Sequence, residues 1–320
     1  MTSRILLLTL MMLTGAVADR EPHVAVGGAA GRPVILIVHG RGFLSRDSAV
    51  FRRDALQALR EGAFRATGDS VLDDDDVRLV WYADVMAARR RTGNSSLCDT
   101  ASDPADAGFS PGFLLRSLAL VASELVDAGA TDSTADDARD LAGDLRFLGN
   151  PSLRCDAEGR VADALGRAER DGRPVIVVAH SLGAFVTWGY LRHRTLDARD
   201  VVEIQRLVTV GSPVGNADLR DLLFGDTTAV YLPRGVRSWI NAVNPDDPFA
   251  SRLTALDTAS GRARAIRGVS DLITGSQDES AHDLRGYLRD AGTASAILAA
   301  WCDRAQQRQR LAGCIALGKR

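Results

Sequence analysis

The stretch from Pro174 to Val186 constrains the fold of this chain more than any other. It starts with a short, continuous run of apolar and mostly β-branched residues behind a proline, which is typical of a strand buried on both faces of a sheet. Residues that favour a helix follow from Leu182. Because strand gives way to helix within a few residues, we predict a sharp turn at Ser181, and the small residues Ala179 and Gly183 leave room for it.

A serine in such a turn presents its hydroxyl at the carboxyl edge of the sheet. The N–H of Leu182 then lies at the start of a helix, where backbone donors lack partners and can bind a developing oxyanion. The segment Ala179-His180-Ser181-Leu182-Gly183 resembles the nucleophile elbow of the α/β-hydrolase superfamily, G-x-S-x-G, with alanine in place of the first glycine. The resemblance implies this fold and a nucleophilic role for the serine. The alternative is an ordinary strand-to-helix turn that contains a serine.

The rest of the chain alternates between strand and helix patterns. Short apolar runs predict strands at 33–38, 77–82, 174–179, 204–210 and 236–243. Helices are predicted at 47–66, at 157–170 and after the elbow, and the first has apolar residues at helical spacing: Val50, Leu56, Leu59 and Phe64. This alternation indicates an α/β protein with a mostly parallel, doubly wound sheet and helices on both faces.

The alternation fails between residues 86 and 156. Within this segment a helix is predicted from about Gly112 to Ala128, with too many apolar positions for one narrow stripe, so it is expected to be buried or to shield an apolar cavity. We expect residues 86–156 to form a lid-like, partly helical insertion over the carboxyl edge of the sheet, within one hydrolase domain that spans residues 19–320.

The amino terminus has the pattern of a secretory signal peptide, residues 1–18. Arg4 precedes an apolar segment that is too short to span a bilayer, and Ala16-Val17-Ala18 offers a cleavage site. We therefore expect a secreted or periplasmic protein; the alternative is a short membrane anchor that is retained. No later stretch has the roughly 18 uninterrupted apolar residues of a spanning helix.

Four cysteines in an exported protein predict two disulfides. Of the three possible connectivities we favour Cys98–Cys155 with Cys302–Cys314, because each pair brackets one local segment; four free thiols are the alternative. No C-x-x-C element is present, so a zinc site is not expected. The acidic run Asp73–Asp76 lacks the spacing of a calcium loop and is expected to be a solvated turn.

The formal net charge of −2 gives no electrostatic case for binding nucleic acid or an anionic membrane. The glycines after the first strand do not continue into a dinucleotide-binding pattern, and no glycine-rich loop ends in Lys-Ser or Lys-Thr. No cofactor is therefore implied.

A serine nucleophile needs a base to accept its proton. The single lysine, Lys319, lies in the carboxyl-terminal tail and is discarded. Four of the five histidines stand in the lead-in, in strand-end motifs or far along the elbow helix: His23, His39, His180 and His193. We expect the two strand-end histidines to point away from the serine hydroxyl. His282 is left, and it stands where the resemblance implies the base, in the order serine, acid, histidine.

The acid is predicted after the strand at 236–243. Asn244-Pro245-Asp246-Asp247 looks like the N-x-x-D turn of lipase-like hydrolases, and Asp247 matches its spacing better than Asp246. Its carboxylate would accept a hydrogen bond from the far ring nitrogen of His282. The alternative is that these aspartates only shape a turn.

A second oxyanion donor is predicted in His39-Gly40-Arg41-Gly42, which is similar to the H-G-x-G loop of the family, and the N–H of Arg41 should face the oxyanion. The guanidinium of the same residue could instead meet an anionic substrate group or a carboxylate. The remaining residues of the two motifs are expected to support this geometry: His39, Gly40, Gly42, His180 and Gly183.

Together these features imply an exported serine hydrolase that cleaves carboxylic esters, of lipids or other apolar acyl groups, through a Ser181–His282–Asp247 triad and an acyl-enzyme. An amidase, peptidase or thioesterase would use the same groups. A catalytically inactive fold that binds a lipid or a partner protein is the alternative from another class.

Overall fold

A computed structural model describes residues 31–41, 47–87, 143, 147, 149–196, 202–224, 230–254, 256–257, 262–263, 266–275, 280–303 and 312–318. The predicted signal peptide, the helix expected near 112–128, Gly42 and Cys98 lie outside these residues. The expectations for them stay predictions.

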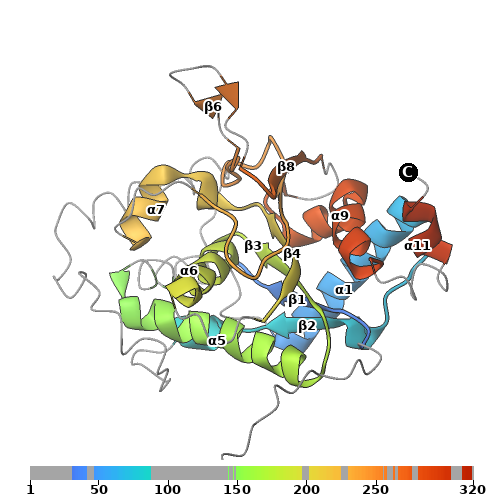
Figure 1. The fold of residues 1–320 in the computed structure, drawn as a ribbon, viewed down its shortest axis with the longest axis horizontal. Helices are drawn as coiled ribbons and strands as arrows, with labels where there is room; N and C mark the ends of the chain where they lie inside the picture. Colours follow the sequence, from blue (N-terminus) through green and yellow to red (C-terminus); the bar gives the residue numbers. More distant parts are fainter. Residues whose placement is uncertain are drawn as a thin grey trace, which may run out of the picture. The chain divides into compact units, whose positions relative to one another are not determined.

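Six parallel strands form one sheet at the centre of the described residues (Figure 1). Their order is β2-β1-β3-β4-β5-β8, and every neighbouring pair is parallel. The bounds are β1 Val34–Val38, β2 Val77–Val80, β3 Val175–His180, β4 Ile204–Val210, β5 Trp239–Val243 and β8 Val269–Ile273. A separate antiparallel pair consists of β6 Leu256–Asp257 and β7 Arg262–Ala263. The predicted α/β class is confirmed.

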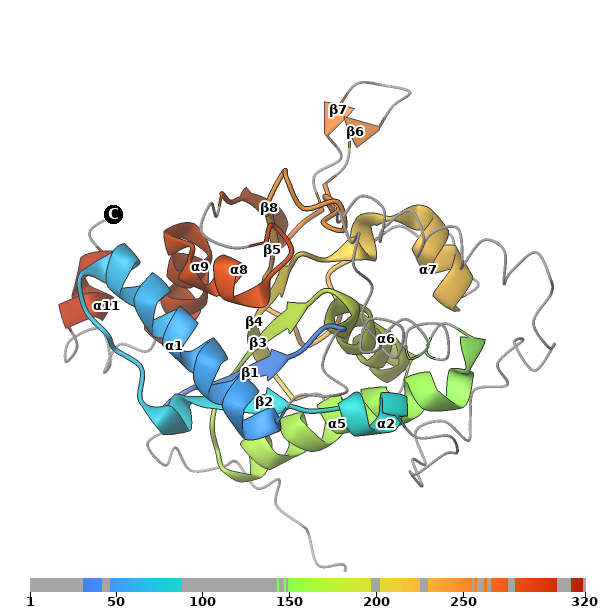
Figure 2. The ribbon, with the colours of Figure 1, turned by 180° about the vertical axis from the view of Figure 1, so that it is seen from behind.

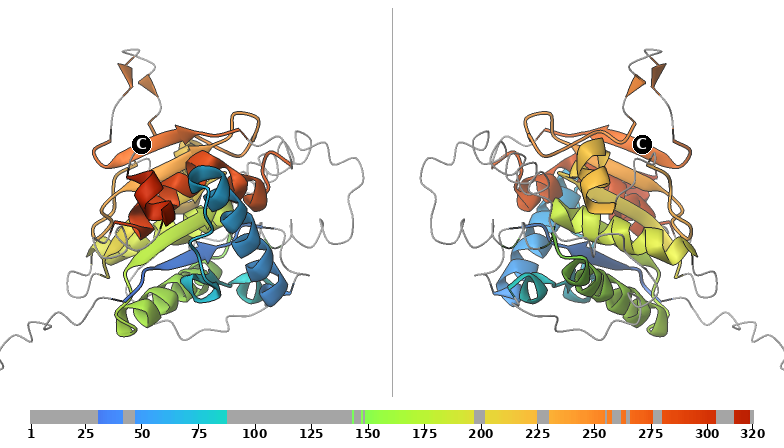
Figure 3. Two further views of the ribbon diagram at one scale, coloured as in Figure 1. Left: turned by 90° about the vertical axis from the view of Figure 1, so that its right-hand side faces the viewer. Right: turned by 90° about the vertical axis from the view of Figure 1, so that its left-hand side faces the viewer.

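Helices cover both faces of the sheet (Figures 2 and 3). On one face, α1 Ser48–Thr67 packs along α8 Leu284–Arg289 and α9 Ala291–Trp301. On the other face, α5 Pro151–Arg170 packs along α6 Leu182–Leu196. The smaller helical elements are η1 Asp74–Asp76, α2 Ala83–Ala87, η4 Pro213–Gly215, α7 Ala217–Phe224 and α11 Ala312–Leu317.

The two helical layers explain why the central strands are continuously apolar. Successive side chains of a strand point to opposite faces, so each face needs its own apolar set. In β1, Val34, Leu36 and Val38 belong to the core under α5 and α6. Ile35 and Ile37 belong to the core under α1, α8 and α9. All five side chains are buried, and each contributes about 1.5–3 kcal/mol to stability.

The apolar face of α1 differs from the prediction. Leu56 and Leu59 are buried, whereas Val50 and Phe64 are 42% and 61% exposed, so the expectation for these two was wrong. Small residues take their place: a Cβ on Gly62 would lie 2.1 Å from the carbonyl oxygen of Leu288. The buried face combines the large side chains of Phe51, Leu56 and Leu59 with small residues that allow the close approach of α8.

One strand and two element boundaries also differ. The strand β8 was not predicted, because its pattern, Val-Ser-Asp-Leu-Ile, is only partly apolar, as suits a strand at the edge of the sheet. The strand predicted from Val236 begins at Trp239 instead, although Val236 forms an isolated bridge with Ile204. The helix α5 begins at Pro151, capped by the side chain of Asn150, so the insertion boundary expected at residue 156 falls inside a core helix.

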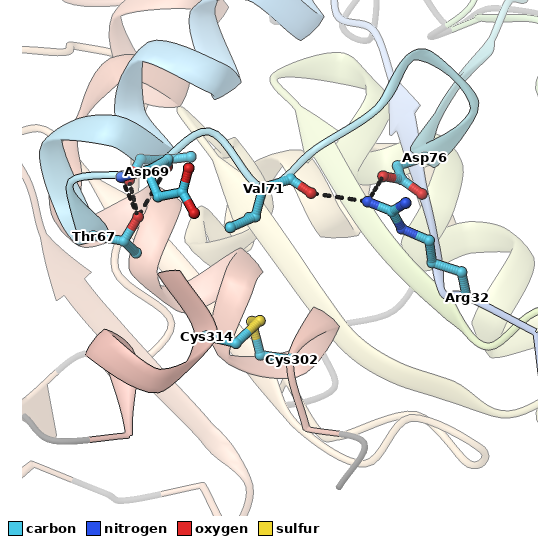
Figure 4. The surroundings of a disulfide bond; sticks show 8 residues. Arg32, Thr67, Asp69, Val71, Asp76, Cys302 and Cys314 are labelled. Carbon is cyan, nitrogen blue, oxygen red and sulfur yellow. Dashed lines mark hydrogen bonds and ion pairs between the residues drawn. A yellow bond between two sulfur atoms is a disulfide. The ribbon is translucent and has the colours of Figure 1, made fainter. Parts of the chain in front are cut away.

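The acidic run at 73–76 is solvated only in part. Asp73, Asp74 and Asp75 are exposed, but Asp76 is 1% exposed and pairs with two arginines. Its carboxylate lies 2.8 Å from Arg32 and 3.3 Å from Arg173 (Figure 4 shows the first pair). Burial raises the pKa of Asp76 despite these arginines. Asp76, just before β2, is thus linked by ion pairs to the residues that precede β1 and β3.

Cys302 and Cys314 form a disulfide, as predicted, with their Cα atoms 5.5 Å apart (Figure 4). The bond joins the end of α9 to α11, next to the connection between α1 and β2. A Cβ on Gly313 would lie 2.5 Å from Val71, which shows how closely α11 approaches this connection. Cys155 is also disulfide-bonded, and its predicted partner, Cys98, lies outside the described residues. Among the helices described, none is long and apolar enough to cross a membrane.

Replacing both Cys302 and Cys314 by serine is expected to lower the free energy of unfolding by about 3 kcal/mol, because the bond closes a loop of 12 residues in the unfolded chain. Urea denaturation without reductant measures the change. Ile315→Ser, an exposed change on the same helix, is the control and should cost less than about 1 kcal/mol. Equal midpoints for the double variant and the parent would contradict a stabilising role for the bond.

Candidate active site

Four strands carry the predicted site residues at one edge of the sheet. Ser181 follows β3, His39 follows β1, Asp247 follows β5 and His282 follows β8. The chain leaves β1 for α1 on one face and leaves β3 for α6 on the other, so a topological switch point lies between these two strands. Doubly wound sheets bind ligands at the carboxyl ends of strands beside such a point.

Ser181 lies in the sharp turn between β3 and α6. Its φ is 51°, and among the described residues it is the only one other than glycine with a positive φ. This conformation costs an ordinary residue roughly 1 kcal/mol or more, so the surrounding structure must hold it. Hydrogen bonds do so on both sides: the N–H of Ser181 donates to Val210 (3.1 Å), and its carbonyl accepts from Ala184 (2.9 Å).

A chain of hydrogen bonds connects the serine to a buried carboxylate. The Oγ of Ser181 lies 2.9 Å from Nε2 of His282. The Nδ1 of the same ring lies 2.9 Å from Oδ2 and 3.0 Å from Oδ1 of Asp247. Asp246 is exposed, and its N–H donates to the side chain of Asn244. The structure thus brings together the serine, the histidine and the aspartate that the sequence favoured.

The environment of Asp247 keeps it ionised. Burial alone would raise the pKa of this carboxyl group, but hydrogen bonds from His282, Tyr287 and the N–H of Phe249 outweigh it, so the pKa lies below its ordinary value. An ionised carboxylate accepts a hydrogen bond and cannot donate one. The proton of the neutral imidazole is therefore on Nδ1, which leaves Nε2 of His282 free to accept the serine proton.

Tyr287, which the sequence did not indicate, contacts the acid directly. Its hydroxyl donates to Oδ2 of Asp247 over 2.6 Å and accepts the N–H of Asn244 over 3.1 Å. Burial and the adjacent carboxylate raise the pKa of this phenol well above its usual range, so it stays a donor. A tyrosine on an amphipathic helix carries no local signal of such a contact.

Gly211, at the end of β4, leaves room for this cluster. Its φ is 55°, and a Cβ there would lie 2.9 Å from Oδ2 of Asp247, 3.1 Å from the ring of Tyr287 and 3.2 Å from Nδ1 of His282. The sequence placed a glycine at the end of a strand but gave it no role. Its position, beside the strand that ends in the serine, was the signal that could have revealed it.

The predicted oxyanion donors flank the serine. Leu182 is the first residue of α6, where an N–H lacks a partner within the helix. The loop after β1 runs against the elbow, because a Cβ on Gly40 would lie 2.7 Å from Cβ of Ser181. A Cβ on Gly183 would lie 2.3 Å from the carbonyl oxygen of His39, so this close approach requires glycine there. Arg41 follows directly, and Gly42 lies outside the described residues.

His39 anchors the loop after β1. Its Nδ1–H donates to the carbonyl of Gly40 (2.7 Å), and its Nε2 accepts the N–H of Tyr82 (3.1 Å). The hydroxyl of Tyr82 also donates to the carbonyl of His39 (2.7 Å), and the two rings stack at 4.1 Å. Burial lowers the pKa of His39 to about 4, so the ring stays neutral at neutral pH.

His180 connects the elbow to the histidine loop. Its Nε2 lies 2.9 Å from the carbonyl oxygen of His282, which can only accept, so Nε2 carries the proton. The two ring centroids lie 4.8 Å apart, so His180 packs against the imidazole of His282, and its Nε2 bonds to the His282 carbonyl rather than to the Ser181 hydroxyl. Burial is the main cause, and the charge of His282 the second, that lowers the pKa of His180 to about 3.

Phe249 lies against the other side of His282, with ring centroids 4.2 Å apart. The guanidinium of Arg41 lies 5.7 Å from the Phe249 ring centre. An aromatic ring thus lies against the imidazole, and a cationic group lies near that aromatic ring. The sequence noted Phe249 only as a neighbour of the acid.

No group of three or more possible metal ligands occurs among the described residues. Searches against protein-family models, curated proteins and solved structures found no significant match to this chain.

The buried neutral histidines, His39 and His180, should make the stability of the fold sensitive to acid. Their folded-state pKa values lie below the ordinary 6.5, so only the unfolded chain takes up these protons as pH falls. Their contribution to stability is complete above pH 6.5 and is lost progressively down to about pH 4 for His39 and about pH 3 for His180. Between pH 7 and pH 5 the loss is about 2 kcal/mol for each histidine.

Urea denaturation at pH 7 and pH 5 measures this loss. His180→Gln keeps a donor for the carbonyl of His282 but cannot titrate, so its stability should change with pH by about 2 kcal/mol less than the parent. An equal pH dependence in both proteins would show that His180 is not held neutral in the folded state.

Proposed function

We propose that this chain is a serine hydrolase of the α/β-hydrolase type that cleaves carboxylic esters through an acyl-enzyme. The observation that carries the proposal is the unbroken series of hydrogen bonds from the Ser181 hydroxyl through both ring nitrogens of His282 to the buried Asp247 carboxylate. This is the arrangement of a nucleophile, a base and an orienting acid.

Three further features support the family assignment. The residues occur along the chain as serine, acid and histidine, the order that α/β-hydrolases use. The serine has a strained backbone between a central parallel strand and a helix, as a nucleophile elbow requires. All three side chains come from the carboxyl edge of one sheet, beside its topological switch point.

In the acylation step, Ser181 Oγ attacks the ester carbonyl carbon while Nε2 of His282 accepts the hydroxyl proton. Asp247 stabilises the resulting imidazolium and remains ionised. The N–H groups of Leu182 and Arg41 bind the carbonyl oxygen as it becomes negative. The imidazolium then gives its proton to the departing alcohol oxygen, the C–O bond breaks, and the acyl group remains on the serine.

Deacylation repeats these steps with water. Nε2 of His282 takes a proton from the water as the oxygen attacks the acyl carbon, and the proton then returns to Ser181 Oγ when the ester bond to the enzyme breaks. The products are a carboxylic acid and the free enzyme. No metal or organic cofactor takes part in this scheme.

We also propose an apolar acyl group and an extracytoplasmic site of action. The apolar segment 112–128 supports the first, and its role as a lid over the site is part of the proposal. The signal-like residues 1–18 and the Cys302–Cys314 disulfide support export to an oxidising compartment.

Ser181→Ala is expected to lower the hydrolysis of short p-nitrophenyl esters by about 10³-fold or more, since the remaining donors bind the transition state but no nucleophile is left. Exposed Ser270→Ala is the control and should keep full activity. The parent and the control should also react covalently with a fluorophosphonate probe, and Ser181→Ala should not.

Undiminished turnover by Ser181→Ala would refute the nucleophile. A parent protein that neither hydrolyses esters nor takes up the probe would favour the inactive, binding-only alternative. Faster cleavage of matched amides or thioesters than of the ester would instead change the substrate class.

Gly211→Ala is expected to lower kcat by at least about tenfold, because the added Cβ would displace Asp247, Tyr287 or His282. Gly172→Ala is a matched control, since Gly172 also has a positive φ, of 63°, but nothing lies within 4 Å of its Cβ position. Both variants should lose about 1 kcal/mol of stability from backbone strain. Equal kcat values for the two variants would contradict the crowding that the structure indicates around Gly211.

A further inference from the structure

We propose that Tyr287 is a positioning residue that fixes the Asp247 carboxylate and limits the negative charge it offers to His282. This inference rests on the proposed hydrolase function. It concerns a residue that lies outside the predicted motifs and is not needed by the reaction scheme above.

The carboxylate is held by donors from three parts of the chain. The N–H of Phe249, within the same turn, donates to Oδ1 over 2.9 Å. His282 contacts both oxygens, and Tyr287 contacts Oδ2 over 2.6 Å, the shortest of these distances. With Oδ1 and Oδ2 each bound from a different direction, the carboxylate cannot rotate without losing a hydrogen bond.

The phenol itself is held rigidly. Tyr287 is 2% exposed and lies on α8, which packs against α1 and α9. The N–H of Asn244 donates to its oxygen, which leaves the hydroxyl proton to point at Asp247. The backbone of Gly211 lies close to one edge of the ring, since a Cβ at this position would be 3.1 Å from Tyr287. The donor is therefore placed before any substrate binds, which is what preorganisation of a catalytic group requires.

The same contact adjusts the charge on the acid. Tyr287 and His282 both donate to Oδ2, so each of these two hydrogen bonds weakens the other. Without the phenol, more of the negative charge is directed at the imidazole, and the protonated, inactive form of His282 is stabilised. The acid limb of the pH–rate profile should then move to higher pH.

Other ionisable groups around the imidazole do not replace this effect. His180, from β3, faces the ring of His282 and stays neutral down to about pH 3. Ser181 contributes a neutral hydroxyl, and Asp247 is the acceptor. Asp283 accepts hydrogen bonds from Arg285 and from the backbone at the start of α8. These groups remain in place when only the phenol oxygen is removed.

Tyr287→Phe tests the proposal. We expect kcat to fall about tenfold, which corresponds to about 1.4 kcal/mol of transition-state stabilisation, with KM changed less than about twofold. We also expect the acid limb of kcat/KM to move to higher pH. Tyr231→Phe, at an exposed tyrosine, is the control and should change neither quantity.

A double-mutant cycle separates positioning from general stability. In an Asp247→Ala background, Tyr287→Phe should have almost no further effect on kcat, because the group it acts through is gone. A tenfold loss in both backgrounds, or a loss of kcat with an unmoved pH profile, would overturn the proposal in favour of a purely structural role.

A readout without turnover distinguishes failure of this inference from failure of the proposed function. The Nδ1 proton of His282 can be followed by NMR as a low-field resonance, together with the titration of its carbon-bound protons. In Tyr287→Phe the resonance should shift and the titration should move to higher pH. An unchanged resonance and titration would overturn the positioning role even if the parent protein proves to hydrolyse no ester; shifts in a protein without esterase activity would uphold it and reject only the function.

Discussion

The parallel pairing of β3 with β1 and β4 is the constraint on which the rest of the structure depends. Because these strands run in one direction, their carboxyl ends share one edge, and residues far apart along the chain meet there. Both faces of the strands are buried, which requires the continuous apolar runs seen in the sequence and a helical layer on each side. The chain leaves β1 and β3 for helices on opposite faces, and at this switch point the loop after β1 packs closely against the turn that carries Ser181.

A second constraint is that buried polar groups need partners. The Asp247 carboxylate is tolerated in the interior because three donors surround it, and a buried charge without them would cost several kcal/mol. The cluster in turn requires the absence of a side chain at Gly211 and a strained backbone at Ser181. Local conformations that are unfavourable alone are thus stabilised by a network of hydrogen bonds and by the two cores.

The same reasoning explains what the sequence could and could not predict. Ser181 and Asp247 follow recognisable strands, and His282 was selected by elimination among the histidines and by the residue order of the family that the chain resembles. Tyr287 belongs to the site only because α8 docks beside the end of β4, where Gly211 lies, and a contact between segments 76 residues apart leaves no local pattern. The buried face of α1 was misjudged because, at about 3.6 residues per turn, Val50 and Phe64 point away from the side of the helix on which Gly62 meets α8.

The placement of His282 shows how such long-range contacts replace local ones. This histidine follows β8, the edge strand, which has a neighbour on one side only within the described sheet. Two contacts from elsewhere fix its loop: the side chain of His180 donates to the carbonyl of His282, and the side chain of Asn244 donates to that of Ala281. Locally, Asp283 caps α8. The imidazole is therefore positioned from the ends of β3 and β5, the strands that also carry the serine and the acid. Because both strands are interior to the sheet, the geometry of the site depends on the rigid centre of the fold rather than on its edge.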